Sequence, residues 1–394
     1  MKKNKSVKDS SVADEELRQK AISLYLQNWK IPAICQAVGC SRSWFFKWLQ
    51  RFETGDPNWF KSESKTPKNI HKKFDQQTEK LIIDVRKKLM ATPFSQYGPQ
   101  AIYYDLEQQG HNPPPVWQIA RVLERYNLSR PKGKSPYIPK GKEYPYNYIL
   151  CQQMDLVGPR YLFCKSRYYF LSLIDCDTHY AQTRILENKG ADSICQELVN
   201  FWKVTGTPDF LQMDNDLSFW GSLIRPEAVG KIIRLCLSLR VTPVFIPLSE
   251  PWRNGVIEHF NNTMQQYVLK NNHPDIKALK KTACHFDEIH NNCHHYSSQN
   301  GKTPIEVFNL YGYPMAPLEE SYKLPKKKIP LDDGDIHVIR FIRSNLIYNI
   351  FGLKYTLPEK AKYEYVKGII SVADNCLRIY RDHDFIKEFP FQLY

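Results

Sequence analysis

The chain has 394 residues, of which 42% are hydrophobic and 13% aromatic, a composition that excludes a mostly disordered protein. No apolar run approaches the roughly 18 residues that cross a bilayer, and no signal peptide precedes the first predicted helix, so we expect a soluble intracellular protein without a membrane partner. The net charge is +14, and residues 1–150 carry 26 basic and 14 acidic side chains. This basic excess predicts a nucleic-acid partner, with solubility alone as the alternative.

Residues 1–66 are predicted to form a helix-turn-helix DNA-binding domain. Apolar residues from Leu17 onward recur at helical spacing, residues 31–38 predict a short second helix, and Gly39 predicts a tight turn. Ser41 is expected to cap a third helix, which would enter the major groove. The outer face of that helix carries the expected DNA contacts, which are Arg42, Ser43, Lys47 and Arg51. A plain three-helix bundle with a solvated basic face is the alternative.

Residues 67–130 are predicted to form a second helical module that repeats the helix order of the first. Three amphipathic segments lie between residues 75 and 128, and the prolines at 113–115 must precede the third helix because proline cannot lie inside it. We interpret this module as a second DNA-binding unit and residues 131–147 as a basic, proline-rich linker. The expected phosphate contacts are Arg121, Arg125, Arg130 and Lys132.

From residue 148 the pattern changes to alternating strands and helices. Three β-rich segments come first, and helices and strands then alternate up to a helix that begins near Asn254. This order predicts an α/β catalytic core with a mixed sheet at residues 148–315. A helix is expected over residues 224–239. Short strands between residues 336 and 380 predict a small all-β barrel at residues 326–394, so the fold class is multidomain.

Three acids occupy informative positions in this core. Asp155 lies in the first strand, Asp214 ends the strand at residues 210–213, and Glu258 lies one turn into a helix. A carboxylate in an apolar strand is costly to bury unless a cation neutralises it. Mg²⁺ prefers oxygen ligands, and three carboxylates can hold two such ions about 3.5–4 Å apart for phosphoryl displacement. Solvated or helix-capping carboxylates are the alternative.

The ten cysteines are scattered without a CxxC pair, so we expect them to be reduced. One dense cluster of cysteines and histidines lies between Cys284 and His295 on a predicted polar helix and its exit. Zinc needs four ligands that converge at defined spacing, so a metal site is the less favoured interpretation of this cluster.

The three acids stand within longer motifs. Asp155, Asp214-Asn215 and the segment Pro251-x-x-Asn254-Gly255-x-x-Glu258 resemble the catalytic signature of the DDE transposase and retroviral-type integrase superfamily. The order of modules resembles that of bacterial insertion-sequence transposases, which have a helix-turn-helix N-terminus, a ribonuclease-H-like core and a small β C-terminal domain. Thr303-Pro304-Ile305-Glu306 resembles the exit from that core.

The resemblance implies a DNA transposase, a polynucleotidyl transferase that cleaves transposon ends and joins the 3′-hydroxyls to target DNA. It implies that Asp155, Asp214 and Glu258 are the catalytic residues and hold two Mg²⁺ or Mn²⁺ ions, and it adds Asn254 and Asn262 to the expected DNA contacts. The implied partner is double-stranded DNA, on which the chain forms a homo-oligomer, and the implied location is the bacterial cytoplasm at the nucleoid. Whether an ATPase partner selects the target stays open.

Two departures from the superfamily lie between Asp214 and Glu258, and a third is that Asn262 and Gln265 stand where retroviral integrases carry basic residues. The spacing between Asp214 and Glu258 is long, and the helix expected over residues 224–239 would take up the excess. Asp216 stands where the superfamily usually has glycine, which leaves a second acid beside Asp214. A transposase-derived DNA-binding protein without catalysis is the alternative function. A ribonuclease H would share the metal chemistry but leave the basic helical modules unexplained.

Overall fold

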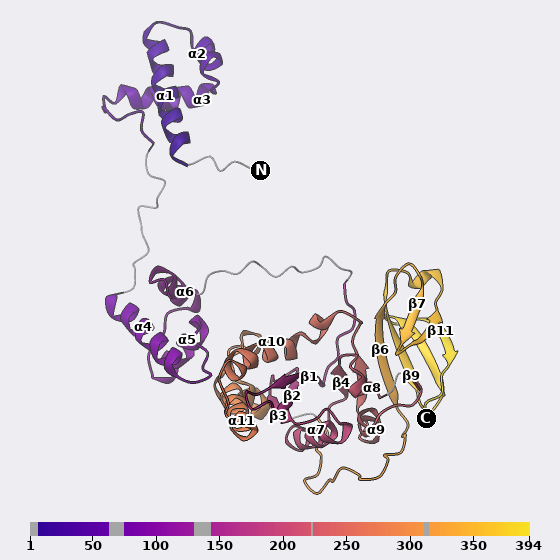
Figure 1. Cartoon of the computed structure of the whole chain (residues 1–394). Coiled ribbons are helices and arrows are strands. Elements are labelled where there is room, and N and C mark those ends of the chain that lie inside the picture. Colours follow the sequence, from indigo (N-terminus) through magenta and orange to yellow (C-terminus); the bar gives the residue numbers. More distant parts are fainter. Residues whose placement is uncertain (1–6, 63–74, 130–142, 222–223, 311–314) are drawn as a thin grey trace. The chain divides into compact units, whose positions relative to one another are not determined.

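The computed structural model describes residues 7–62, 75–129, 143–221, 224–310 and 315–394. The chain divides into two compact units, Met1–Phe74 and Asp75–Tyr394 (Figure 1). Within the described residues, no helix combines the length and the apolar character that crossing a membrane requires.

The first unit contains three helices, α1 (Val7–Leu26), α2 (Ile31–Val38) and α3 (Arg42–Glu53). Gly39 ends α2 with a φ of +70°, a left-handed conformation that glycine adopts without strain. The Ser41 hydroxyl accepts a hydrogen bond of 3.1 Å from the backbone N–H of Trp44 and so caps α3. Ile22, Ile34 and Phe45 pack together between the helices. The predicted helices and their turn are confirmed.

The second unit begins with α4 (Gln76–Ala91), α5 (Pro99–Gln108) and α6 (Val116–Arg125). Ion pairs join them: Lys88 contacts Asp105 at 3.0 Å between α4 and α5, and Arg125 pairs with Glu79 between α6 and α4. The hydroxyl of Tyr126 also donates to Glu79, at 3.0 Å. These contacts close the three helices into one bundle.

A nine-stranded sheet runs through the rest of the second unit, in the order β11-β10-β9-β6-β5-β4-β1-β2-β3. Its first five strands in the chain are antiparallel along β1-β2-β3 and parallel along β1-β4-β5. The resulting order is 3-2-1-4-5, which confirms the predicted mixed sheet. These strands are β1 (Cys151–Tyr161), β2 (Arg167–Asp175), β3 (Ala181–Leu186), β4 (Phe210–Met213) and β5 (Thr242–Phe245).

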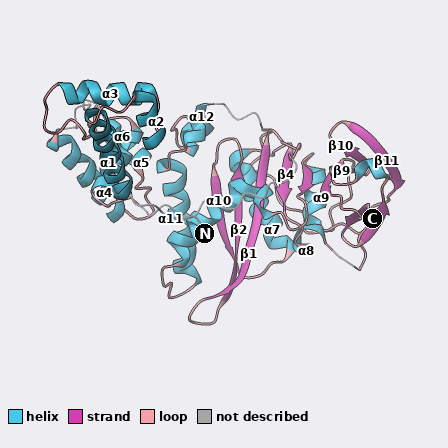
Figure 2. Cartoon of the chain, turned by 90° about the horizontal axis from the view of Figure 1, so that it is seen from above, coloured by secondary structure: helices cyan, strands magenta, loops and turns pink. Residues whose placement is uncertain are grey.

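Helices cover both faces of this sheet (Figure 2). Successive residues of a strand point to opposite faces, and β2 shows this, because Leu171 and Leu173 pack in one apolar cluster and Phe170 and Ile174 in the other. The first cluster includes residues of α7 (Ala191–Thr205), α8 (Leu217–Trp220) and α9 (Lys231–Ser238). The second includes residues of α10 (Gly255–Met264) and α11 (Ile276–Cys293). Helix α12 (Pro304–Leu310) follows α11 in the chain.

The long helix expected over residues 224–239 is wrong. Helix α9 begins only at Lys231, and Gly221 pairs with Val229 in an isolated antiparallel bridge. A Cβ at Gly221 would lie 2.7 Å from the backbone nitrogen of Gly230, so the two chain segments approach too closely for any side chain there. The extra residues between Asp214 and Glu258 therefore lie in a turn before α9.

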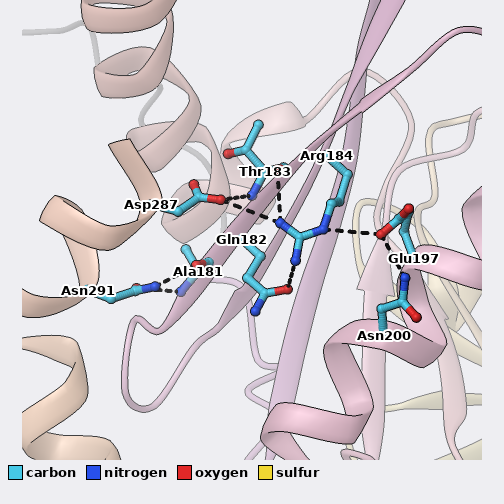
Figure 3. A network of polar contacts seen from close by, with 8 residues as sticks. All are labelled: Ala181, Gln182, Thr183, Arg184, Glu197, Asn200, Asp287 and Asn291. Atoms are coloured by element: carbon cyan, nitrogen blue, oxygen red, sulfur yellow. Dashed lines mark hydrogen bonds and ion pairs between the residues drawn. The ribbon is translucent and has the colours of Figure 1, made fainter. Parts of the chain in front are cut away.

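Side chains of helix α11 form hydrogen bonds with the backbone of the edge strand β3 and so fix the helix to the sheet (Figure 3). Asn291 accepts from the N–H of Ala181 at 3.0 Å and donates to its carbonyl at 2.9 Å. Asp287 accepts from the N–H of Thr183 at 2.7 Å and contacts Arg184 at 3.7 Å. These bonds satisfy backbone groups of a sheet edge that would otherwise be open to pairing.

The expected closed barrel at residues 326–394 is not formed by the described strands. Instead β6 (Asp335–Phe341) pairs in parallel with β5, and β9 (Tyr365–Ser371), β10 (Cys376–Arg381) and β11 (Asp384–Pro390) follow antiparallel, as an open extension of the core sheet. The central residues of β6 are buried, which suits an interior strand. The hairpin of β7 (Ile347–Ile350) and β8 (Leu353–Thr356) packs against it, with the Tyr348 hydroxyl donating to the Val338 carbonyl at 2.7 Å.

Candidate active site

Asp155 and Asp214 stand at matching positions of two neighbouring strands. β1 and β4 are parallel, and their last paired residues are Met154 and Met213. Asp155 is the next residue of β1, and Asp214 directly follows the end of β4. Since neighbouring strands lie about 4.8 Å apart, this register places the two acids side by side at one end of the strand pair.

Glu258 lies on α10, which two hydrogen bonds fix to β1. The backbone N–H of Ile257 donates to Gln153 Oε1 at 3.0 Å, and Asn261 Nδ2 donates to Asp155 Oδ2 at 2.6 Å. Glu258 stands between these two attachment points in the chain. Strand β1, which carries Asp155, thus fixes the position of α10, which carries Glu258. The sequence interpretation missed Gln153 and Asn261, although the spacing of three residues between Glu258 and Asn261 places both on one helix face.

The turn before α10 is fixed to β4. Gln212 Nε2 donates to the carbonyl of Arg253 at 2.9 Å and to Asn254 Oδ1 at 2.8 Å. Gln212 lies two residues before Asp214. Its side chain therefore connects the strand that precedes Asp214 to the turn that precedes Glu258. Asn254, an expected DNA contact, is buried and serves this internal bond. Asn262, the other expected contact on α10, is exposed.

The electrostatics of the site couple the three acids. Burial, together with the negative charges of Asp214 and Glu258, raises the pKa of Asp155 to about 6, against the lowering effect of hydrogen bonds from Leu156 and Asn261. Burial also raises the pKa values of Asp214 and Glu258. Within the described residues, no lysine, arginine or histidine forms an ion pair with any of the three acids. Negative charge therefore gathers here with no ion-pair partner in the described part of the chain.

The donor set fits a hard divalent cation, although it is not a preformed cage. Among the described residues, no group of three or more His, Cys, Asp or Glu side chains is arranged to hold a metal ion as it stands. The three acids offer oxygen ligands only, which suits Mg²⁺ or Mn²⁺. Asn261 Oδ1, on the amide that bonds Asp155, is a buried acceptor without a hydrogen-bond partner.

Asp216, the additional acid, has a local structural role. Its carboxylate accepts from the N–H of Ser218 at 2.7 Å and caps α8, while its own N–H donates to Asp214 Oδ1 at 2.9 Å. Asp216 therefore shapes the turn that follows β4 and orients the Asp214 carboxylate through the backbone.

The expected DNA contacts of the first unit differ in their surroundings. Arg42, Ser43 and Lys47 are exposed on α3. Arg51 is half-buried, stacks on the Trp48 ring at 4.9 Å and donates to the Lys61 carbonyl at 3.3 Å. The first three side chains are therefore accessible to a partner, whereas Arg51 is engaged within its own domain.

Among the contacts expected in the second module, Arg121 is exposed beside the Trp117 ring, with its guanidinium carbon 4.9 Å from the ring centre. Arg125 is also exposed, and its guanidinium pairs with Glu79 of α4, as described above. Arg130 and Lys132 lie outside the described residues.

The cluster of cysteines and histidines packs the end of α11 against its neighbours. His290 bonds the His179 carbonyl at 3.0 Å, His294 bonds the Phe94 carbonyl at 2.8 Å, and His295 stacks on Tyr104. Burial lowers the pKa of His294 to about 4, so its ring is neutral at pH 7. Cys284 and Cys293 are exposed. The histidines thus attach the α4–α6 bundle to the core within the second unit.

Comparisons with known proteins give one family match and several similar solved structures. The homeodomain-like domain family matches residues 12–59. No curated protein matches the chain. Similar solved structures include the HTLV-2 integrase catalytic core domain in complex with magnesium (16% identity, 40% of this chain and 95% of that chain, TM-score 0.31) and the BIV integrase catalytic core domain (14%, 41% and 95%, 0.32). Another is a simian T-cell lymphotropic virus intasome in complex with PP2A regulatory subunit B56 gamma (14%, 75% and 97%, 0.36). The chain thus carries a homeodomain-like helix-turn-helix domain at residues 12–59 and, in its second unit, a core built on a mixed sheet.

Proposed function

We propose that this protein is an integrase-type DNA transposase that cleaves transposon ends and joins their 3′-hydroxyls to target DNA. One observation carries the proposal: Asp155 and Asp214 stand side by side on parallel strands, and the helix bearing Glu258 is hydrogen-bonded to the first of them. A DNA-binding domain on the same chain supplies the substrate class.

Asp155, Asp214 and Glu258 would hold two Mg²⁺ or Mn²⁺ ions, which supply an activated nucleophile and stabilise the leaving oxygen in phosphoryl transfer. Both oxygens of Asp155 are already oriented, because Leu156 N–H donates to Oδ1 at 2.9 Å and Asn261 donates to Oδ2 at 2.6 Å. Such preorganisation lowers the cost of bringing the carboxylates into one ligand set.

Arg42, Ser43 and Lys47 would contact the transposon end, since they are exposed on the third helix of a helix-turn-helix domain. Arg121 and Asn262 are further contacts that solvent reaches. Joining two ends to nearby target positions needs two catalytic sites, so we infer a homo-oligomer that assembles on DNA. An ATPase partner is not needed for the transfer step itself, because one phosphodiester bond is exchanged for another.

The experiment is strand transfer of a labelled end oligonucleotide into plasmid DNA with Mg²⁺ or Mn²⁺. Inverted repeats in the DNA that flanks the gene would supply the end sequence. The wild-type protein should join the label to the plasmid, whereas Asp214→Asn should bind the end without joining it. A wild-type protein that binds the end but never cleaves or joins it would instead be a transposase-derived DNA-binding protein.

A further inference from the structure

The side chain of Arg340, on β6, reaches the turn that carries the second acid. It is 4% exposed, and its Nη2 donates to Asn215 Oδ1 at 2.9 Å. Its Nη1 donates to the carbonyl of Ile246 at 3.1 Å and its Nε to that of Asn349 at 2.8 Å. Asn215 follows Asp214 directly, and its Nδ2 donates to the same Ile246 carbonyl at 2.8 Å. One buried guanidinium thus joins β6 to the ends of β4 and β5.

A second contact reaches the turn before Glu258. The hydroxyl of Tyr365, on β9, donates to Glu250 at 2.9 Å and accepts from Arg253 Nη2 at 2.9 Å. Arg253 also pairs with Glu250 at 2.9 Å, and its guanidinium carbon lies 4.1 Å from the ring centre of Tyr144. The 3₁₀ turn Pro251–Asn254, which leads into α10, is therefore held from the C-terminal strands as well as from β4.

The position of Arg340 is specific for arginine, because few other side chains could occupy this buried site and keep its hydrogen bonds. Burial lowers the pKa of Arg340 to about 10, so the side chain is still charged at neutral pH. All three of its nitrogens donate to oxygen acceptors, which offsets the cost of burying the charge. Lysine has the charge but not the planar fork that reaches several acceptors at once, and methionine has neither.

We propose that the C-terminal strands are part of the catalytic centre, with Arg340 and Tyr365 as positioning residues for Asp214 and Glu258. This inference rests on the proposed function, because the acids matter only if they hold the metal ions. Arg340 acts through Asn215, and Tyr365 acts through Arg253. Neither would touch substrate or metal, but each fixes the backbone from which a ligand projects.

The test compares Arg340→Met, Arg340→Lys and Tyr365→Phe with the wild-type full chain. The matched control is Arg234→Met, because Arg234 is also a buried arginine that bonds the C-terminal region, through the carbonyls of Ile329 and Tyr394, away from the acids. Two quantities are measured for each protein: the rise in melting temperature with increasing Mn²⁺, and the rate of strand transfer. End binding in EDTA is the third measurement.

We expect Arg340→Met to raise the Mn²⁺ concentration for half-maximal thermal stabilisation by about 10-fold or more and to slow strand transfer by a similar factor. Tyr365→Phe should have a smaller effect in the same direction, and Arg340→Lys should fall between wild type and Arg340→Met. Arg234→Met should lower the melting temperature without altering the Mn²⁺ dependence. End binding should be unchanged in all variants. Adding Asn215→Ala to Arg340→Met should change the Mn²⁺ dependence and the strand-transfer rate little further, because the two side chains act through the same hydrogen bond.

The outcomes distinguish the transposase function from the positioning role of Arg340 and Tyr365. If the wild-type protein shows neither Mn²⁺ stabilisation nor joining, the proposed function fails. If the wild type is active and Arg340→Met and Arg340→Lys have its Mn²⁺ dependence, the positioning role is wrong while the transposase assignment stands. If Arg340→Met does not fold, Arg340→Lys and Tyr365→Phe decide the question. An equal Mn²⁺ effect in Arg234→Met would reduce the role of Arg340 to general stability.

Discussion

Asn261 Nδ2 donates a hydrogen bond of 2.6 Å to Asp155 Oδ2, which joins the helix of the third acid to the strand of the first. Because Asn261 follows Glu258 by one helical turn, the same bond restricts how α10 can rotate over the sheet. The separation of Asp155 and Glu258 is therefore set by the protein before a metal ion or DNA arrives. This relationship makes the effect of single changes at the site predictable.

The first prediction concerns the acids themselves. Asp155→Asn, Asp214→Asn and Glu258→Gln should each abolish cleavage and joining, because each removes a ligand charge, while end binding measured by gel shift in EDTA stays near wild type. Asp209→Asn is the matched control, since this exposed aspartate lies just before β4, at the opposite end from Asp214. Normal strand transfer by any one of the three variants would remove that residue from the site.

The second prediction concerns the bond from Asn261. Asn261→Ala should slow strand transfer by about 10- to 100-fold, as expected when a partner that orients a metal ligand is removed. Asn261→Asp should have a further effect, because a second carboxylate against Asp155 raises the pKa of that acid. Gln266→Ala changes an exposed amide near the end of the same helical segment and should leave the rate unchanged. Wild-type rates in Asn261→Ala would contradict the positioning role.

The third prediction is a pH dependence. The pKa of Asp155 is raised to about 6, so this carboxyl is largely protonated below that pH in the metal-free protein. Protons and metal ions compete for the same oxygens, and strand transfer at limiting Mn²⁺ should fall as the pH drops through 6. A higher Mn²⁺ concentration should move this decline to lower pH. Rate–pH profiles at several Mn²⁺ concentrations measure the shift, and profiles that superimpose would contradict it.

The fourth prediction concerns recognition of the DNA end. Replacing Arg42 and Lys47 together by alanine should weaken end binding and reduce the slope of log K against log salt by about 2, if each side chain releases one counterion. The control replaces Lys20 and Lys30, which are exposed in the same unit but lie outside α3. Fluorescence anisotropy over a salt series measures both quantities. An unchanged slope would show that α3 does not contact the phosphates.

The fifth prediction concerns stability at Asp287. Burial raises the pKa of this carboxyl from its ordinary value of 3.8 to about 7. Between these values the folded protein holds a proton that the unfolded chain releases, so the free energy of unfolding falls as the pH rises. Asp287→Asn should flatten this dependence between pH 4 and 7 in thermal melts, because the amide cannot titrate but still offers an oxygen to the N–H of Thr183. If the free energy of unfolding of the variant fell equally steeply with pH, the titrating proton would belong to a group other than Asp287.

The sequence by itself determined the local elements and the chemistry of the candidate site. Ser41 and Gly39 mark the ends of helices through bonds to their own neighbours in the chain, and the period of apolar residues identifies a helix or strand from a short window. For the same reason the predicted strand at residues 210–213 coincides with β4, and Asp155, Asp214 and Glu258 were found from their places on strands and a helix. None of this information requires knowing what lies across the sheet.

Only the tertiary structure decided which distant segments meet. A strand pattern gives the period but not the partner, so the pairing of β5 with β6, instead of closure of a barrel, could not be predicted. The sequence likewise could not show that Asn254 bonds Gln212 or that Arg125 pairs with Glu79. No sequence pattern indicated a role for Arg340, because that role depends on a hydrogen-bond acceptor, Asn215, that lies 125 residues away in the chain. Polar side chains acquire their function from such partners, and the fold alone brings them within bonding distance.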